Sequence, residues 1–226
     1  MTTQLDKLYE SLRADILNLV LSPGLRLSER MIEARYRGPS RTPIRAAMLR
    51  LEANRLVQKV DRVWSVTPLS LTHIMQACEF RIGIEREGVT LACERAQPRK
   101  LEQIEAELVP SDTDASRKDW LHSGCEFHVE LMRLSGNELY VEAMQDVMQR
   151  LARIRWLEVV NEAGRARTII EHREILRHLR AGDAAAARDA VTRHALETQQ
   201  RHQDTLAKSV MRTGSLVIGG SNYDQP

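Results

Sequence analysis

Three histidines in the C-terminal two thirds of the chain lie on apolar stripes of the segments that carry them. Each shares its stripe with aliphatic, Met or Cys residues at offsets of three, four or seven residues, the spacing of one helix face. They are His128, His172 and His194. One such histidine is more often a hydrogen-bonded core residue than a ligand. Three of them, from separate helices, favour a divalent metal site, and zinc and nickel are the first candidates. Such a site leaves a position for water or a ligand carboxylate.

A second group with chemical potential lies near the N-terminus, where a helix is predicted to begin after the break at Gly38-Pro39. Either Ser40 or Thr42 is suited to cap it, and Pro43 is tolerated in its first turn. Hydroxyl and guanidinium groups at a helix N-terminus favour phosphate, because the freed amides and the helix dipole attract anions. This helix start is predicted to enter a DNA groove, with Ser40, Arg41, Thr42 and Arg45 exposed.

Arg81 lies on another inward stripe, with Glu85 one turn later. Two interpretations are open, since a buried arginine needs an anion. In the first, an Arg81–Glu85 ion pair fixes the helix. In the second, Arg81 binds the carboxylate of an effector that bridges it to the metal.

The elements that position the N-terminal group are three short helices and a hairpin. Apolar spacing predicts helices over 4–20, with Val20 on the buried stripe, over 29–36, and from Ser40 or Thr42 onward. After Leu56 the period approaches two, which predicts a hairpin that turns at Asp61-Arg62. Lys59 and Arg62 at its tip contact DNA in one interpretation and form a solvated basic surface in the other. We predict a winged helix-turn-helix over residues 1–68, although such tri-helical cores also serve as protein-docking modules.

The rest of the chain is helical in pattern. Breaks are predicted at Gln97-Pro98, 111–116, Ser135-Gly136, Ala163-Gly164 and Gly182-Asp183, which leaves about six helices. We therefore predict a mostly α protein, in which an all-α antiparallel helical bundle covers residues 69–210. Residues 211–226 are predicted to form a flexible tail.

Charge and composition separate the two parts and exclude several classes of protein. Residues 1–68 contain 12 Lys and Arg against 7 Asp and Glu, a net charge of +5, whereas the remainder, with 21 against 24, carries −3. No apolar run predicts a membrane span or a signal peptide, so we expect a cytoplasmic protein. The three cysteines form no paired motif and are expected to be reduced thiols. Phosphate-loop, nucleophile-elbow and metalloprotease motifs are absent from the sequence, so we do not expect an enzyme.

Three stretches of the first third resemble the GntR family of winged-helix repressors: Leu25–Glu29, Ser40–Arg45 and Leu49–Glu52. The resemblance implies operator contacts by Arg30, Ser40, Arg41, Thr42 and Arg45. We expect Arg45 to read a base, and Arg41 to bind phosphate.

The sequence departs from this family at two turns. Arg55 stands where the family usually ends its recognition helix on Gly, and the turn around Arg62 lacks the usual glycine of the wing. Asn54 is the candidate for the left-handed residue in place of that Gly. Trp64 favours a hairpin that packs on a partner as well as contacting DNA.

The helical part resembles the FCD effector domain of the FadR-type branch, and its six predicted helices resemble the smaller, VanR-like variant. The shared motifs, in order, are Arg81–Glu85, Phe127-His128, Ser135–Asn137, Glu171-His172, Gly182-Asp183 and His194. The resemblance implies that the three histidines bind a divalent metal together with an aspartate one turn before the first, and that a small organic acid enters the site. Gly124 stands at the aspartate position here. The fourth ligand is then water or the Cys125 thiolate, or the site holds no metal.

These features predict a DNA-binding transcription regulator that binds a short inverted repeat as a homodimer. Repression is the commoner role in the family, so we expect a repressor. A small carboxylic acid at the metal site is expected to modulate its binding to operator DNA. Two alternatives are a metal-sensing repressor and a metal-dependent hydrolase or lyase. The second lacks a base, because Glu126 and Glu171 are expected to point away from the histidines.

Overall fold

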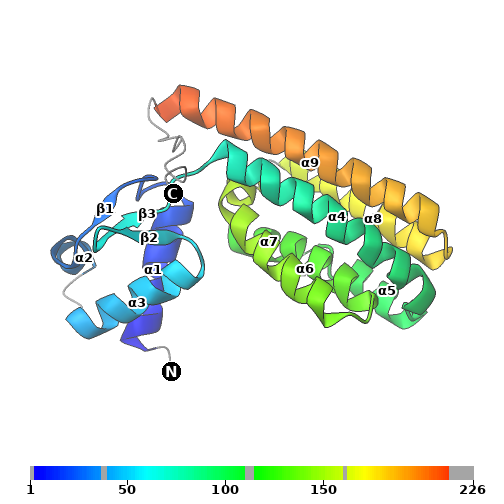
Figure 1. Cartoon of the computed structure of the whole chain (residues 1–226), viewed down its shortest axis with the longest axis horizontal. Helices are drawn as coiled ribbons and strands as arrows, with labels where there is room; N and C mark the ends of the chain where they lie inside the picture. The colour runs from blue at the N-terminus through cyan, green and yellow to red at the C-terminus, as the bar shows by residue number, and fades with distance from the viewer. Residues whose placement is uncertain (1–2, 37–39, 110–114, 160–161, 214–226) are drawn as a thin grey trace, which may run out of the picture. The chain divides into compact units, whose positions relative to one another are not determined.

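The computed structural model describes residues 3–36, 40–109, 115–159 and 162–213, and it has the predicted fold class. These residues form nine helices and three strands, which divide into two compact units at Leu71–Thr72, the second extending to Ala207 (Figure 1). The first unit contains α1–α3 and the small sheet, and the second contains the long helices. None of the described helices is both long and apolar enough to span a membrane.

Helix α1 (Gln4–Leu17) begins at a capping box, in which Thr3 and Asp6 satisfy each other's backbone amides. It ends three residues earlier than predicted, because Leu19 adopts the left-handed conformation with φ 61°. The chain leaves the helix there, so Leu21 is buried whereas Val20, expected on the apolar stripe, is 56% exposed. The break therefore comes before Ser22-Pro23-Gly24, and a single strained backbone position sets it.

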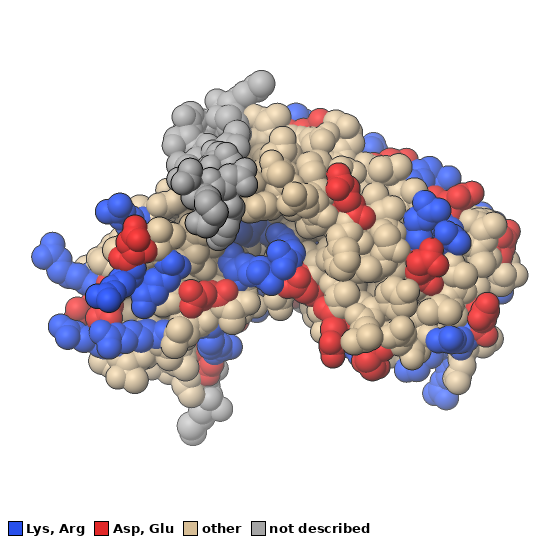
Figure 2. Space-filling view, in the orientation of Figure 1, with Lys and Arg blue, Asp and Glu red and all other residues tan. Residues whose placement is uncertain are grey.

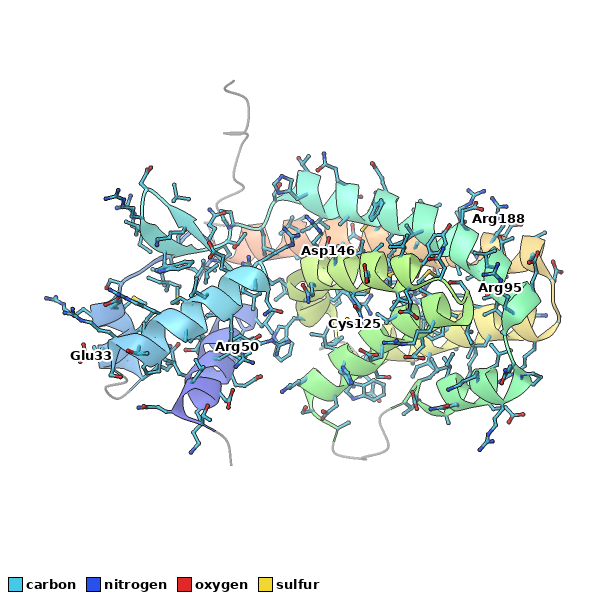
Figure 3. The ribbon with its side chains drawn as sticks, turned by 60° about the horizontal axis from the view of Figure 1, so that its bottom comes forward. Glu33, Arg50, Arg95, Cys125, Asp146 and Arg188 are labelled. Carbon is cyan, nitrogen blue, oxygen red and sulfur yellow. The ribbon has the colours of Figure 1, made fainter. Side chains whose placement is uncertain are left out.

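Helices α2 (Glu29–Arg35) and α3 (Arg41–Ala53) follow the predicted signals. Ser28 accepts a hydrogen bond from the Met31 amide at 3.1 Å, and Leu27 and Ile32 are both buried as a hydrophobic staple requires. Ser40 is the N-cap residue of α3 through its backbone. Arg50 of α3, labelled in Figure 3, pairs with Asp6 of α1 at 2.9 Å, which ties these two helices at the surface above their shared apolar core.

The wing is a three-stranded antiparallel sheet with the order β1-β3-β2. Strands β2 (Val57–Val60) and β3 (Val63–Val66) form the predicted hairpin, and the two residues of β1 (Arg26–Leu27), which the sequence did not reveal, pair with β3. Asp61 and Arg62 have φ of 48° and 64°, as a two-residue hairpin turn of type I′ requires. The turn therefore forms without the glycine that is usual there.

The second unit is the expected bundle, with six helices among its described residues. They are α4 (Leu71–Arg95), α5 (Pro98–Ala106), α6 (Arg117–Leu134), α7 (Glu138–Glu158), α8 (Glu162–Arg180) and α9 (Ala184–Thr213). Helices α4 and α9 lie side by side and antiparallel (Figure 1), since Met75 contacts Gln199 and Gln203 while Glu87 pairs with Arg188. Turns at Gly136 and Gly182, both with φ 66°, join α6 to α7 and α8 to α9.

Two boundaries of this unit differ from the prediction. The break placed at Ala163-Gly164 comes earlier, so both residues lie inside α8, which begins at Glu162. Helix α9 continues to Thr213 and thus includes the first residues of the predicted tail; the remainder of that tail, 214–226, is outside the described residues.

The end of α3 provides a test of backbone strain. Asn54, proposed as the left-handed residue, has φ −88° and donates to the Arg50 carbonyl at 2.7 Å, whereas Arg55 has φ 56°. That prediction was wrong, because α3 ends at Ala53 and the left-handed position falls two residues later.

We predict that Arg55→Gly raises the free energy of unfolding by about 0.5 kcal/mol, since glycine adopts positive φ without steric cost. Asn54→Gly should lower it by about 0.5–1 kcal/mol, because a right-handed position gains only flexibility and loses a hydrogen bond. Urea unfolding measures both. The same sign of change in both variants would contradict this assignment of strain.

Candidate metal and effector site and candidate DNA-binding surface

The three predicted histidines converge inside the second unit. His128 comes from α6, His172 from α8 and His194 from α9, and one ring nitrogen of each lies within 4.8 Å of those of the other two. Their ring centroids are 4.8–5.3 Å apart, and all three side chains are buried. Helical spacing thus placed each ring inward, and the bundle brings the rings to one point.

The surroundings keep these imidazoles neutral. Burial, the main cause, together with the charges of the neighbouring histidines and arginines, lowers the pKa of His128 and His172 well below the ordinary value of 6.5. Burial also lowers the pKa of His194, to about 4, although its hydrogen bond to Glu171 opposes this. Neutral imidazole is the form that binds a metal ion.

Glu171 holds one of these rings in place. His194 Nδ1 lies 2.6 Å from a Glu171 oxygen, and Arg201 donates to both carboxylate oxygens at 3.2 Å. Burial by itself raises the pKa of Glu171, but the hydrogen bonds from His194 and Arg201 outweigh it and lower this pKa to about 2. The expectation that Glu171 points away from the histidines was wrong, because it reaches His194 across the α8–α9 pair. A carboxylate on Nδ1 leaves Nε2 as the free ligand atom.

Arg81 and Glu85 of α4 lie against the same cluster. They form the expected ion pair, with Arg81 Nε 3.0 Å from Glu85 Oε2, and both side chains are buried. The other Glu85 oxygen is 2.7 Å from His128 Nδ1, while Arg81 Nη2 is 3.1–3.2 Å from the two ring nitrogens of His128. The ion pair is thus present, and it also contacts the histidine site.

The donor set fits a divalent metal ion. Nε2 of His172 and Nε2 of His194 are buried and have no hydrogen-bond partner among the described residues. An unsatisfied buried polar atom costs about 1–3 kcal/mol, which a metal ion between neutral imidazoles would offset. Gly124 supplies no ligand, and Cys125 of α6 (Figure 3) does not join the three histidines in the group of converging ligand atoms.

A fourth buried histidine was missed in the sequence. His202 of α9 is buried, and its Nδ1 lies 2.5 Å from Glu158 of α7. The signal was present, because the stripe that carries His194 continues at four-residue steps through buried Thr198, His202 and Leu206.

The seven predicted DNA-contact residues are all exposed on the first unit: Arg30, Ser40, Arg41, Thr42, Arg45, Lys59 and Arg62. Lys and Arg side chains gather over this unit in Figure 2, with Asp and Glu between them. Ser40, Arg41, Thr42 and Arg45 lie at the start of α3, and Lys59 and Arg62 lie at the hairpin end. Arg45 of the first set, Lys59 and Arg62 of the second and the ring of Trp64 help to line one groove of about 580 Å³.

Glu29 at the first position of α2 organises this surface. It accepts a hydrogen bond from Arg45 Nε at 2.7 Å, and Arg41 Nε is 3.8 Å from its other oxygen. Mainly through the Arg45 hydrogen bond, these cations lower the pKa of Glu29. The Lys59 ammonium lies over the Trp64 ring, 5.2 Å from its centroid, so Trp64 supports a basic side chain of the wing.

Three helices, a hairpin and exposed arginines at the start of the third helix, followed by a helical unit around buried histidines, define a winged-helix DNA-binding protein with an appended α-helical domain. Residues 4–63 match the bacterial regulatory proteins of the gntR family, and residues 76–197 match the FCD domain. The chain belongs to the GntR family and carries an FCD domain, as the sequence motifs predicted. It is a DNA-binding transcriptional regulator and not an enzyme.

Relatives with known names cover most of the chain. The HTH-type transcriptional repressor RspR of Escherichia coli K12 is 24% identical over 198 residues, which span 86% of each chain. The uncharacterized HTH-type transcriptional regulator YdhC of Bacillus subtilis 168 is 29% identical over 82% of this chain and 85% of its own. The solved structure of E. coli McbR/YncC shares the fold, with a TM-score of 0.67 at 18% identity over 91% of this chain and 100% of that one.

The neutral histidines predict a pH dependence of stability. Their pKa is lower in the folded protein than the unfolded value of about 6.5, so the unfolded chain binds more protons at acidic pH. Their contribution is therefore complete above about pH 6.5 and is lost as the pH falls toward the folded value, about 4 for His194. Within that window each histidine costs about 1.4 kcal/mol per pH unit.

Urea unfolding of chelator-treated protein between about pH 7 and pH 5 measures this slope. His172→Gln should reduce it by the contribution of about one proton, whereas His73→Gln, at an exposed position of α4, should leave it unchanged. Equal slopes in the two variants would show that His172 is not kept neutral by the fold.

Proposed function

We propose that this regulator is a repressor that responds to a small carboxylic acid, which binds in the helical domain beside a metal ion held by His128, His172 and His194. The observation that carries the proposal is the convergence of three buried, neutral imidazoles, two of which have an Nε2 without a partner among the described residues. Zinc or nickel suits such ligands. The ion would supply a Lewis-acidic position for an effector oxygen, and Arg81 would contribute to the same pocket.

DNA binding is assigned to residues 1–68, and effector binding and dimerisation to 69–210. Two copies would hold their winged helices at the spacing of adjacent major grooves, which matches a short inverted repeat. The proposed contacts are Arg30, Ser40, Arg41, Thr42 and Arg45 from the helices and Lys59 and Arg62 from the wing. A regulator of chromosomal DNA acts in the cytoplasm.

The effector would act by shifting a population. A ligand changes DNA affinity only if it binds one arrangement of the dimer better than another. The histidine site joins α4, α6, α8 and α9, so a ligand there contacts most of the bundle at once. A bundle made more rigid would hold the two winged helices at one spacing, and operator affinity would follow.

One prediction of this proposal concerns recognition of the operator's base sequence. Arg45→Ala should remove about 1–3 kcal/mol of discrimination between the inverted repeat upstream of the regulator's own gene and a scrambled duplex. Arg41→Ala should weaken binding to both duplexes about equally and reduce the salt dependence by about one phosphate contact. Gel shifts or fluorescence anisotropy at several salt concentrations measure both. Discrimination that survives Arg45→Ala would exclude this residue as the base reader.

Another prediction of this proposal concerns the binding of the metal ion. Zinc at about 100 times its Kd should stabilise the native protein by about 2.7 kcal/mol, and a chelator should reverse this. His128→Ala should abolish the response, while His122→Ala, an exposed histidine on the same helix, should retain it. Thermal unfolding and metal analysis of the purified protein provide the measurement. If the metal alone controls operator binding and no acid does, the chain is a metal-sensing repressor.

A further inference from the structure

Gly124 and Arg155 face each other across the closely packed pair α6 and α7. A Cβ atom added at Gly124 would lie 2.8 Å from Arg155 Nη2, closer than side chains normally approach. The guanidinium therefore occupies the space that a side chain at position 124 would need. Only 7% of Arg155 is exposed, so this charge is held inside the bundle.

The carboxylates of this region have other partners. Glu85 pairs with Arg81, Glu171 with His194 and Arg201, and Glu158 with His202. Within the described part of the chain no ion pair joins Arg155 to a carboxylate, and its buried Nε has no hydrogen-bond partner. A buried guanidinium without an anion is strongly unfavourable, because desolvation of the charge is not compensated.

The positive charge of Arg155 also acts electrostatically on the buried histidines. Burial is the main cause of the low pKa of His128, His172 and His202, and the positive charge of Arg155 adds to it in each case. The unmatched cation, the two Nε2 atoms without partners and the vacant side-chain position at Gly124 thus belong to one region. Arg81 is a weaker candidate for binding an anion there, because Glu85 already neutralises it.

We propose that Arg155 binds one carboxylate of the effector and that the site takes a small dicarboxylate. One carboxylate would bind the guanidinium through charge-assisted hydrogen bonds, and the other would complete the coordination of the ion held by the imidazoles. Gly124 makes this possible, because an aspartate there would pair with Arg155 and take the anion's place. The inference rests on the proposed function and names its ligand class and an additional binding residue.

The test uses the full-length protein, loaded with zinc, and three short dicarboxylates as probes: oxalate, malonate and succinate. The uncharged diamide of each is its control. At least one dicarboxylate should raise the melting temperature and bind in calorimetry, while the diamides should not. If none of the three binds, the inference is overturned.

Arg155→Met keeps the side-chain volume and removes the charge. It should lower the affinity of the bound dicarboxylate about 10- to 100-fold, the loss expected for a charge-assisted contact. It should also leave the melting temperature of the ligand-free protein equal or higher, which a merely structural arginine would not do. Arg153→Met, at a second buried arginine of α7, is the matched control and should retain the affinity. Retained affinity in Arg155→Met would overturn the inference.

Position 124 provides an independent pair of variants if Arg155→Met fails to fold. Gly124→Asp should lower dicarboxylate affinity as Arg155→Met does, because its carboxylate pairs with the guanidinium. Gly124→Asn has nearly the same shape without the charge and should retain more of the affinity; equal losses in the two variants would overturn the inference. Operator binding without ligand should persist in all these variants, so its loss would count against the regulator's DNA contacts and not against the anion site.

Discussion

The cost of removing imidazoles from water is the constraint on which the helical domain depends. Three neutral histidines are costly to bury together unless each ring is oriented and its nitrogens have partners. Glu171 meets this need for His194 and the Arg81–Glu85 pair meets it for His128, while two Nε2 atoms lack a partner among the described residues. The long helices α4, α6, α8 and α9 each contribute one part of this arrangement, so the site also helps to fix their packing.

Whereas the helical domain buries polar and charged groups, the winged-helix unit keeps its charged groups at the surface. Its basic groups stay exposed, and a half-exposed carboxylate, Glu29, holds Arg45 and lies near Arg41 before any phosphate arrives. An exposed ion pair of this kind contributes little stability, because solvent screens the attraction, and it is easily exchanged. The ion pair therefore orients Arg45 but is weak enough to break. A guanine edge or a phosphate can then take the place of the carboxylate.

Much of this could be predicted from sequence, because helical spacing and capping are local. The stripes placed His128, His172 and His194 inward, and Ser28 and Leu27 marked the start of α2. Contacts between elements could not be read in this way. The reach of Glu171 to His194 depends on how α8 and α9 pack, and the two-residue strand β1 is too short to show any period. The end of α3 shows a third limit, since residue preference favoured Asn54 while the helix length placed Arg55 in the left-handed position.

Position 124, where glycine stands in place of the family's aspartate, needs both the sequence and the structure to be understood. The missing carboxylate is visible in the sequence, and by itself it indicates only a weaker metal site. The structure shows that the space is filled by the charge of opposite sign, since Arg155 Nη2 blocks the position of a side chain there. With no carboxylate at position 124, the buried charge of Arg155 stays unpaired, which shifts the charge balance of the pocket in favour of anions. The proposed dianion would remove most of the pocket's positive charge, and a domain whose internal charge changes so much on binding would have a physical basis for responding to its ligand.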